Sequence, residues 1–433
     1  MSQRHTPGRR VVITGVGVIS PIGVGRESFW ASLAAGRCGV GPVSHQFHGT
    51  AAIPGGFVGA EVADFDEKTA RELVPKSQRK SIKVMCRDIQ MGTASAMMAV
   101  ADSSLDMEAV AHDRVGVEFG ANLMYSPPTQ LNDPCWNCVD ENRKFVMAQW
   151  AKQGLTKMEP LWLLKYLPNM PACHIAIFVD AHGPSNSVTQ NEASGNLALT
   201  EALSVIQRGA ADVMIAGATG ARLHEFKVIH AALWGELGFR PDDPPASCRP
   251  FDTERTGEVA GEGACSLILE DEEHARARGA NVLGRLSGGG SSCVAGNRRQ
   301  AAVHAMRAAL RSADLAPGDI GHINAHGLGS PTLDLEEAQA IHDVFGPGAE
   351  IPVTALKGAM GNTAAAAGTI ELAGSLLALQ RGVIPPTLHC DTPDPACNLN
   401  IVRGEPRSTR LRSVLSLNLT RFGQASAVVV QCD

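Results

Sequence analysis

Short apolar runs alternate with longer stretches of helical periodicity along the chain. The apolar runs predict buried strands; in chain order they are VVITGVGV, RVGVEFGAN, ADVMIAGA, ACSLILED, VLSLNL and ASAVVVQC. The longer stretches, such as RQAAVHAMRAALRSAD and TIELAGSLLALQRG, predict helices. Because strands and helices alternate, the pattern favours an α/β fold in which helices cover layered sheets.

The segment GPSNSVTQNEASGNLALTEALSVIQRGAADVMIAGAT has the form of a strand, a tight turn of small residues and a helix. The helix is predicted by the spacings of four and three between Leu199, Leu203 and Ile206. Gly209 is suited to the position just after the helix, where a left-handed backbone is common. Glu192 lies in the turn, at or just before the helix N-terminus. A turn of this kind holds one side chain up to a ligand.

Five further blocks stand along the chain: RRVVITGVGVISPIG from Arg9, PFDTERTGEVAGEGA from Pro250, NAHG from Asn324, K-x-x-x-G from Lys357 and RFG from Arg421. Together with the turn at Glu192, they resemble the blocks of the type II beta-ketoacyl-[acyl-carrier-protein] synthases, the condensing enzymes of fatty acid and polyketide assembly. The blocks come in that family's order and span nearly the whole chain.

The resemblance implies the thiolase fold, in which two similar βα halves form a layered α/β/α/β/α sandwich. The expected halves are residues 1–270 and 271–433. Residues 122–172, rich in Trp, Pro and Asn, resemble the family least, so we expect a cap or a partner-facing insertion there. The family is dimeric, so the resemblance also implies a homodimer or a heterodimer with a Cys-bearing ketosynthase.

The resemblance also assigns active-site positions. The family's nucleophilic cysteine is replaced by Glu192. His326 in NAHG resembles the first of the family's two active-site histidines, and Lys357 resembles its lysine. Asn362 stands in place of the second histidine, and its side-chain NH2 can still donate a hydrogen bond to an enolate oxygen.

Other positions imply substrate binding or support. Asp334 and Glu337 match family positions downstream of NAHG, and Glu337 is a candidate partner for Lys357. The family's HGTST, whose hydroxyls bind pantetheine, is HGLGS here, which leaves Ser330 as the substrate-binding hydroxyl. Phe422 in RFG resembles the aromatic side chain that gates the acyl pocket.

Composition limits the class of protein. A chain of 433 residues with 44% hydrophobic residues has ample material for a core. The formal net charge of −6, without a dense Lys/Arg tract, argues against nucleic acid as a partner. No apolar run approaches the roughly 18 residues that a membrane span requires. Eleven cysteines without a signal segment predict reduced thiols and a cytoplasmic location.

Three other motifs suggest cofactor or metal sites that the sequence does not complete. GVGVIS at Gly15–Ser20 ends in serine and is followed by proline, so it predicts a strand and turn rather than a nicotinamide site. Cys135 and Cys138 form one CxxC without the second pair that zinc needs. His322 and His326 lie on a strand running into a loop, so we expect no metal and no bound cofactor. Phosphopantetheine would arrive on an acyl carrier protein as part of the substrate.

The glutamate decides the functional hypothesis. A carboxylate at position 192 would carry the acyl chain as an anhydride, which hydrolyses, so ordinary condensation is expected to be lost. An ionised Glu192 at about 4 Å from a malonyl carboxylate would repel it by about 4 kcal/mol at an effective dielectric constant of 20. Lys357 and a protonated His326 are the candidate neutralising groups.

The first hypothesis is therefore a ketosynthase homologue that does not condense alone and acts as a chain-length-factor-like partner subunit. One alternative is a malonyl-carrier-protein decarboxylase that uses His326 and Asn362 as hydrogen-bond donors. Another is a hydrolase or acyltransferase in which Glu192 acts as a general base through water.

Overall fold

The strands of the first half of the chain form a mixed sheet in the order β6-β5-β7-β8-β1. The computed structural model describes residues 8–43, 57–348, 350–408, 410 and 412–432. Strand β5 is parallel to both β6 and β7, whereas β8 is antiparallel to β7 and β1. The bounds are β1 Val11–Ser20, β5 Val115–Ala121, β6 Ser185–Val188, β7 Val213–Ala221 and β8 Ala260–Asp271.

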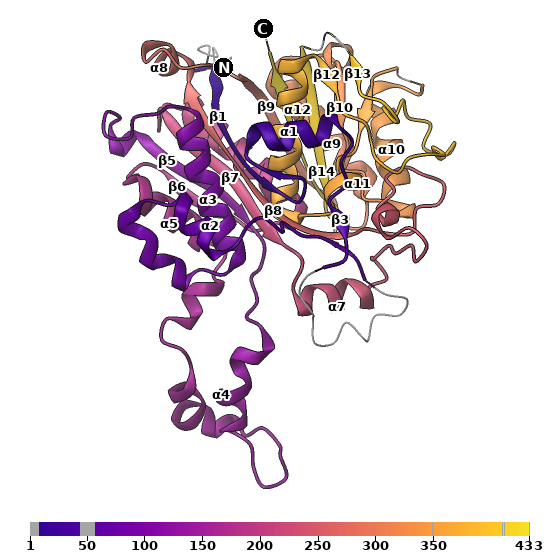
Figure 1. Ribbon diagram of the computed structural model, residues 1–433. Helices are drawn as coiled ribbons and strands as arrows, with labels where there is room; N and C mark the ends of the chain where they lie inside the picture. Colours follow the sequence, from indigo (N-terminus) through magenta and orange to yellow (C-terminus); the bar gives the residue numbers. More distant parts are fainter. Residues whose placement is uncertain (1–7, 44–56, 349, 409, 411, 433) are drawn as a thin grey trace.

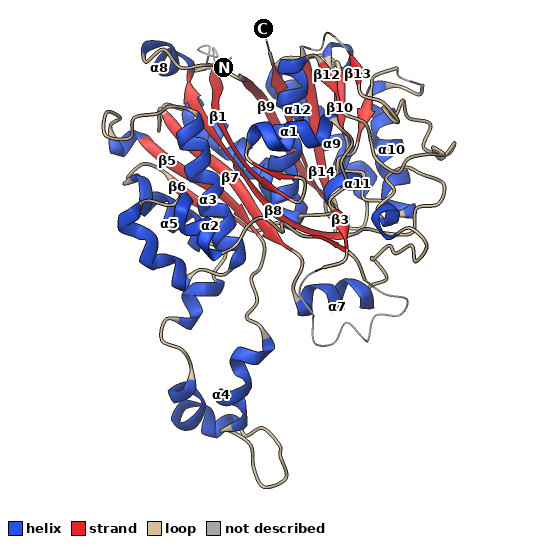
Figure 2. Cartoon of the chain, in the orientation of Figure 1, coloured by secondary structure: helices blue, strands red, loops and turns tan. Residues whose placement is uncertain are grey.

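The second half repeats this arrangement in the order β11-β10-β14-β15-β9, with the same strand directions. Its bounds are β9 Gly284–Cys293, β10 His322–Asn324, β11 Val353–Thr354, β14 Ser413–Leu419 and β15 Gln424–Gln431. The two sheets join where β1 pairs with β9, Val12 opposite Arg285 and Ile13 opposite Gly284. The two similar βα halves implied by the family resemblance are therefore present (Figures 1 and 2).

Helices fill the space between the sheets and cover both outer faces. Helices α6 and α12 pack against each other, α6 on β5 and β7 and α12 on β14. The outer helices are α3 and α5 on the first sheet and α9 on the second, and α10 packs against α9. The bounds are α3 Arg87–Asp102, α5 Met170–Val179, α6 Ser194–Gln207, α9 Arg298–Ala313, α10 Pro331–Phe345 and α12 Ala367–Arg381.

The central position of α12 follows from its sequence. Every residue of this helix from Ala367 to Leu379 is buried, as expected for a helix that is apolar or small on all sides. Each of the six predicted strands and the two predicted helices overlaps one of these elements over most of its length, so those predictions are confirmed. Helix α6 also ends as predicted, because Gly209 follows it with φ of +73°.

Shorter elements connect these layers. They are β2 Gly23–Val24, α1 Arg26–Ala34, β3 Val40–Gly41, β4 Gly59–Ala60, α2 Glu67–Leu73, a 3-10 helix Lys76–Val84, α7 Glu225–Leu233, α8 Glu272–Ala277, α11 Lys357–Met360, β12 Val383–Ile384 and β13 Arg407–Ser408. Within the described residues, no helix is both long and apolar enough to cross a membrane.

Much of the region 122–172, predicted to be a cap or an insertion, projects from the body as an arm (Figure 1). The arm contains α4, Asn132–Trp136, and several short turns before it returns to the body at α5. Large apolar side chains lie exposed along it, including Trp136, Met147 and Leu161. Apolar surface of this kind is typical of an interaction surface.

Candidate active site

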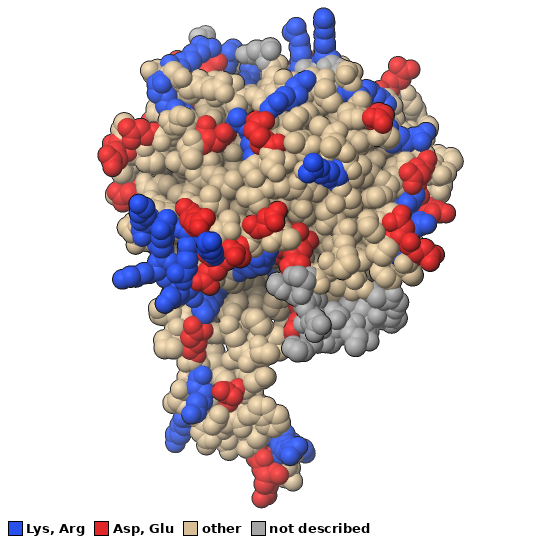
Figure 3. Space-filling model, in the orientation of Figure 1, with Lys and Arg blue, Asp and Glu red and all other residues tan. Residues whose placement is uncertain are grey.

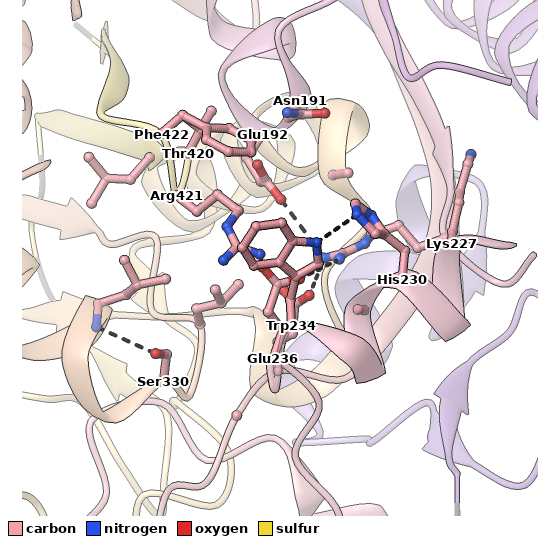
Figure 4. A pocket seen from close by; sticks show the side chains of 18 of the residues that line it. Asn191, Glu192, Lys227, His230, Trp234, Glu236, Ser330, Thr420, Arg421 and Phe422 are labelled. Atoms are coloured by element: carbon pink, nitrogen blue, oxygen red, sulfur yellow. Dashed lines mark hydrogen bonds and ion pairs between the residues drawn. The ribbon is translucent and has the colours of Figure 1, made fainter. Parts of the chain in front are cut away.

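Glu192 lies where the sequence predicted it, in a one-turn 3-10 helix, Asn191–Ala193, directly before α6. The turn is held to the helix because the backbone N–H of Gln190 donates to Ser194 Oγ at 2.8 Å. Asn191 adopts a left-handed backbone with φ of +47°. The Glu192 side chain is 15% exposed and faces a cavity between the two halves (Figure 4).

The cavity has a volume of about 920 Å³ and is lined from both halves. The first half contributes residues around 122–125, 191–192, 222–236 and 256–258, and the second contributes 298, 326–333, 364 and 419–422. Four predicted site residues line it, namely Glu192, His326, Ser330 and Phe422. None of the chain's eleven cysteines is among these described lining residues. The carboxylate of Glu192 therefore occupies a cavity wall that has no thiol.

Behind His326 lies a closed network of buried polar groups. Lys357 Nζ donates to Glu371 Oε1 at 2.5 Å, to the His326 carbonyl oxygen at 2.8 Å and toward His326 Nδ1 at 3.1 Å. Asn418 Nδ2 lies 3.3 Å from the same Nδ1 and donates to Glu371 Oε2 at 2.8 Å. Because Nδ1 faces two donors, the neutral imidazole carries its proton on Nε2. Burial, with the charge of Lys357, holds the pKa of His326 well below its usual range.

The expected pairing of Glu337 with Lys357 is wrong, since Lys357 pairs with Glu371. Glu337 instead accepts the backbone N–H groups of His326 and Gly327 at 2.6 and 2.8 Å. A match to a family position in the sequence does not show where the side chain of that residue points in the folded protein. Here the carboxylate turns toward the loop that carries the histidine, and burial raises the pKa of Glu337 to about 8.

Asp334 fixes the same loop from the first turn of α10. Its carboxylate accepts the backbone N–H groups of Leu328 and Phe251, each at 2.9 Å. Burial raises the pKa of Asp334 to about 6. Asp334 and Glu337 are thus supporting residues that hold His326 at the cavity wall.

A second cluster of charges surrounds Glu192. Asn362 Nδ2 donates to Glu192 Oε1 at 3.1 Å and to Glu258 Oε2 at 2.6 Å. Arg222 lies 3.8 Å from Glu192 Oε1 and 2.5 Å from Glu258 Oε1. Burial raises the pKa of Glu258, and the nearby Glu192 charge adds to that rise while Arg222 opposes it. The group that compensates Glu192 is therefore Arg222, and the expected ion pair with Lys357 or His326 is not formed.

Comparisons with known proteins show the family to which the chain belongs. Residues 8–275 match the family model "Beta-ketoacyl synthase, N-terminal domain", and residues 283–391 match "Beta-ketoacyl synthase, C-terminal domain". The chain belongs to the beta-ketoacyl synthase family. A relative from Synechocystis sp., named "3-oxoacyl-[acyl-carrier-protein] synthase 2", is 32% identical over 96% of both chains.

Solved ketosynthase structures have the same fold. One is described as "The ishigamide ketosynthase/chain length factor", with 28% identity, a TM-score of 0.84, and coverage of 98% of this chain and 100% of that one. Another is a type II polyketide acyl-carrier protein in complex with its ketosynthase, AntDE:AntF. It has 26% identity, a TM-score of 0.80 and the same coverage. The thiolase fold expected for this ketosynthase-family chain is confirmed.

Three charged residues of the site were not predicted as such. Arg222 directly follows β7, and a lone arginine after a strand of small and apolar residues is a signal that could have been used. Glu258 lies within the PFDTERTGEVAGEGA block, whose sequence alone predicts no charged site. Glu371 is the one carboxylate in the otherwise apolar or small central part of α12, and such a charge is normally paired.

The two predicted substrate-binding residues lie nearer the surface. Ser330 caps α10, its Oγ accepting the backbone N–H of Leu333 at 3.4 Å, and also lines the cavity. Phe422 is 60% exposed, beside Arg421. Both side chains line the cavity (Figure 4).

Proposed function

We propose that this ketosynthase-family chain does not condense acyl groups alone and acts as a partner subunit in fatty acid or polyketide assembly. The proposal rests on the environment of the Glu192 carboxylate. This carboxylate is hydrogen-bonded to Asn362 and lies beside Arg222, on a cavity wall without a thiol. A carboxylate held in this way fills the position from which a nucleophile would attack.

The chemistry of acyl transfer supports this proposal. A ketosynthase stores the acyl chain as a thioester on cysteine, formed by attack of the thiolate and release of the carrier's thiol. A glutamate would store the chain as a mixed anhydride, which water cleaves. Loss of a covalent nucleophile costs up to about a millionfold in other enzymes. We therefore expect no condensation by the isolated chain.

A carrier that bears phosphopantetheine is the partner we propose for the cavity. Exposed lysines gather on the 3-10 helix that follows α2, at Lys76, Lys80 and Lys83 (Figure 3). Such a surface attracts an anionic partner, and the phosphodiester of the prosthetic group is anionic. The ketosynthase AntDE, a structural neighbour, is described in complex with its acyl-carrier protein.

A second subunit is the other partner we propose. Strand β6 lies at the end of the sheet order, and in the described residues no strand pairs with its outer edge. The arm adds exposed apolar surface at Trp136, Met147 and Leu161. These features favour a dimer with a second copy or with a Cys-bearing ketosynthase.

Decarboxylation of a malonyl carrier protein remains the second candidate, because His326 retains a proton on Nε2 at the cavity wall. That proton could stabilise a thioester enolate. The other expected donor is less favourable, since Asn362 Nδ2 already donates to both Glu192 and Glu258. Decarboxylation would therefore depend mainly on His326.

The test compares the purified chain with and without a Cys-bearing ketosynthase from its source genome, using acyl and malonyl carrier proteins and mass detection of the products. We expect no condensed product from the chain alone. With the partner, we expect a heterodimer by native mass spectrometry and condensation that requires the partner's cysteine. Condensation by the chain alone would contradict the proposal. Conversion of malonyl to acetyl carrier protein that disappears in His326→Ala would support the second candidate.

A further inference from the structure

Three side chains from two distant segments meet at the outer part of the cavity. Arg421, in the loop between β14 and β15, pairs with Glu236, which follows α7. The Arg421 guanidinium carbon also lies 4.3 Å from the centre of the Trp234 ring and 5.6 Å from that of Phe422. Figure 4 shows Trp234, Glu236 and Arg421 together beside Glu192. We call Trp234, Glu236 and Arg421 the clasp.

Side-chain exposure places the clasp outside the Glu192 cluster. The exposed fraction rises from 3% at Glu258 and 15% at Glu192 to 23% at Glu236 and 33% at Arg421. Trp234 is 56% exposed. Arg222 connects the two levels, since it lies 3.8 Å from both Glu192 and Glu236. The clasp is therefore the outer level of the same charged wall.

We propose that the clasp closes the approach to Glu192, so that an elongated group reaches this glutamate only when the Arg421 to Glu236 pair opens. The pantetheine arm of a carrier protein is the group we expect, and this identification alone rests on the proposed function. The resemblance assigned gating to Phe422. The structure adds an ion pair and an indole ring that hold the neighbouring arginine in place.

One side of the clasp is fixed and the other can move. The backbone of Glu236 donates to the Ala231 carbonyl oxygen at 3.0 Å and accepts from the Glu258 N–H at 2.8 Å. Trp234 Nε1 donates to His230 Nε2 at 2.6 Å, which fixes the indole. Arg421 is held to this side by side-chain contacts. Partly exposed ion pairs and cation–π contacts are individually weak, so the arginine can swing away without unfolding its loop.

Access can be measured with a reporter thiol at position 192. In Glu192→Cys, the labelled fraction of residue 192 is followed by peptide mass spectrometry with iodoacetamide, which is small, and with a maleimide on a long linker. We expect Arg421→Met to accelerate labelling by the long reagent about five- to thirtyfold, and labelling by iodoacetamide much less. Glu236→Gln should act in the same direction, and Arg421→Met with Glu236→Gln should add little to either change alone.

The matched control is Arg299→Met, because Arg299 forms an ion pair with Asp343 at 2.7 Å outside the cavity lining. It should leave both labelling rates unchanged. High salt should accelerate labelling of residue 192 by the long reagent in Glu192→Cys, because salt screens the exposed ion pair. It should not do so in Glu192→Cys that also carries Arg421→Met, because the pair is already absent. If the long reagent labels residue 192 at the same rate in Glu192→Cys alone and when Arg421→Met or Glu236→Gln is added, the proposal that the clasp closes the approach to Glu192 is wrong. The assay needs neither carrier nor second subunit, so its failure is separate from failure of the proposed partner role.

Discussion

One charged network lies behind His326 and another surrounds Glu192, and the two differ in the number of carboxylates for each cationic side chain. The network behind His326 pairs one cation, Lys357, with one carboxylate, Glu371, and both side chains are 0% exposed. The network around Arg222 contains Glu192, Glu236 and Glu258 within 3.8 Å of one guanidinium group. Arg421 compensates one of these carboxylates, Glu236.

The difference separates a structural network from a responsive one. All three protons of the Lys357 ammonium have acceptors in the first network. This network therefore fixes the tautomer of His326, and no Lys357 proton is left to bind another group. The Arg222 network has more carboxylates than guanidinium groups and opens to the cavity. It should therefore respond to pH, to ligand charge and to single substitutions at the surface of the cavity.

Removal of the buried anion should have the largest effect. Glu371→Gln leaves the Lys357 ammonium buried without a counterion, which we expect to lower the free energy of unfolding by about 3–5 kcal/mol. Chemical denaturation measures this loss. The double variant Glu371→Gln with Lys357→Met should recover most of it, because both charges are then removed. A double variant as unstable as the single one would show that the pair is not the reason for the loss.

Removal of the shared cation should have an intermediate effect. Arg222→Met leaves Glu192 and Glu258 facing each other without compensation, and we expect a loss of about 2–3 kcal/mol at pH 8. Burial already raises the pKa of Glu258, and loss of Arg222 raises it further. A carboxyl with a raised pKa stabilises the fold below its unfolded pKa, and that stability is lost as pH rises through the folded value. The loss should therefore be smaller at pH 5 than at pH 8.

Denaturation curves of the parent and Arg222→Met at both pH values check this expectation. Arg299→Met is again the control, since an exposed pair contributes no more than about 1 kcal/mol at either pH. An effect of Arg222→Met that is independent of pH would mean that the arginine acts through packing and not through charge.

The fold was predictable because its evidence is local. Apolar runs identified β1, β5, β7, β8, β14 and β15, and the absence of a polar face in TIELAGSLLALQRG is explained by the burial of α12 between the sheets. The repeat of strand order between the halves was implied by resemblance alone. Which strands pair depends on contacts between distant residues, such as Val12 with Arg285, which periodicity does not report.

The site was predictable only in part for the same reason. The turn predicted the position of Glu192, and the family resemblance implied that His326 belongs to the same site. The partners of the charges were not predicted, because Arg222 to Glu192 and Lys357 to Glu371 join side chains from different elements. Sequence spacing identifies residues that can ionise, but the direction of each side chain in the folded protein decides which of them meet.

Substitution of Glu192 should have the smallest effect on the free energy of unfolding. Glu192→Gln retains a carbonyl oxygen that can accept from Asn362 Nδ2, as Glu192 Oε1 does at 3.1 Å, and removes one charge from a cluster with excess carboxylates. We expect the free energy of unfolding to change by less than about 1 kcal/mol, in either direction. The same substitution at Glu371 should cost several times more, so the two variants measured side by side compare the networks directly. If Glu192→Gln proves as costly as Glu371→Gln, the cluster around Arg222 is a balanced network like the other, and Glu192 is a structural residue of the cavity wall.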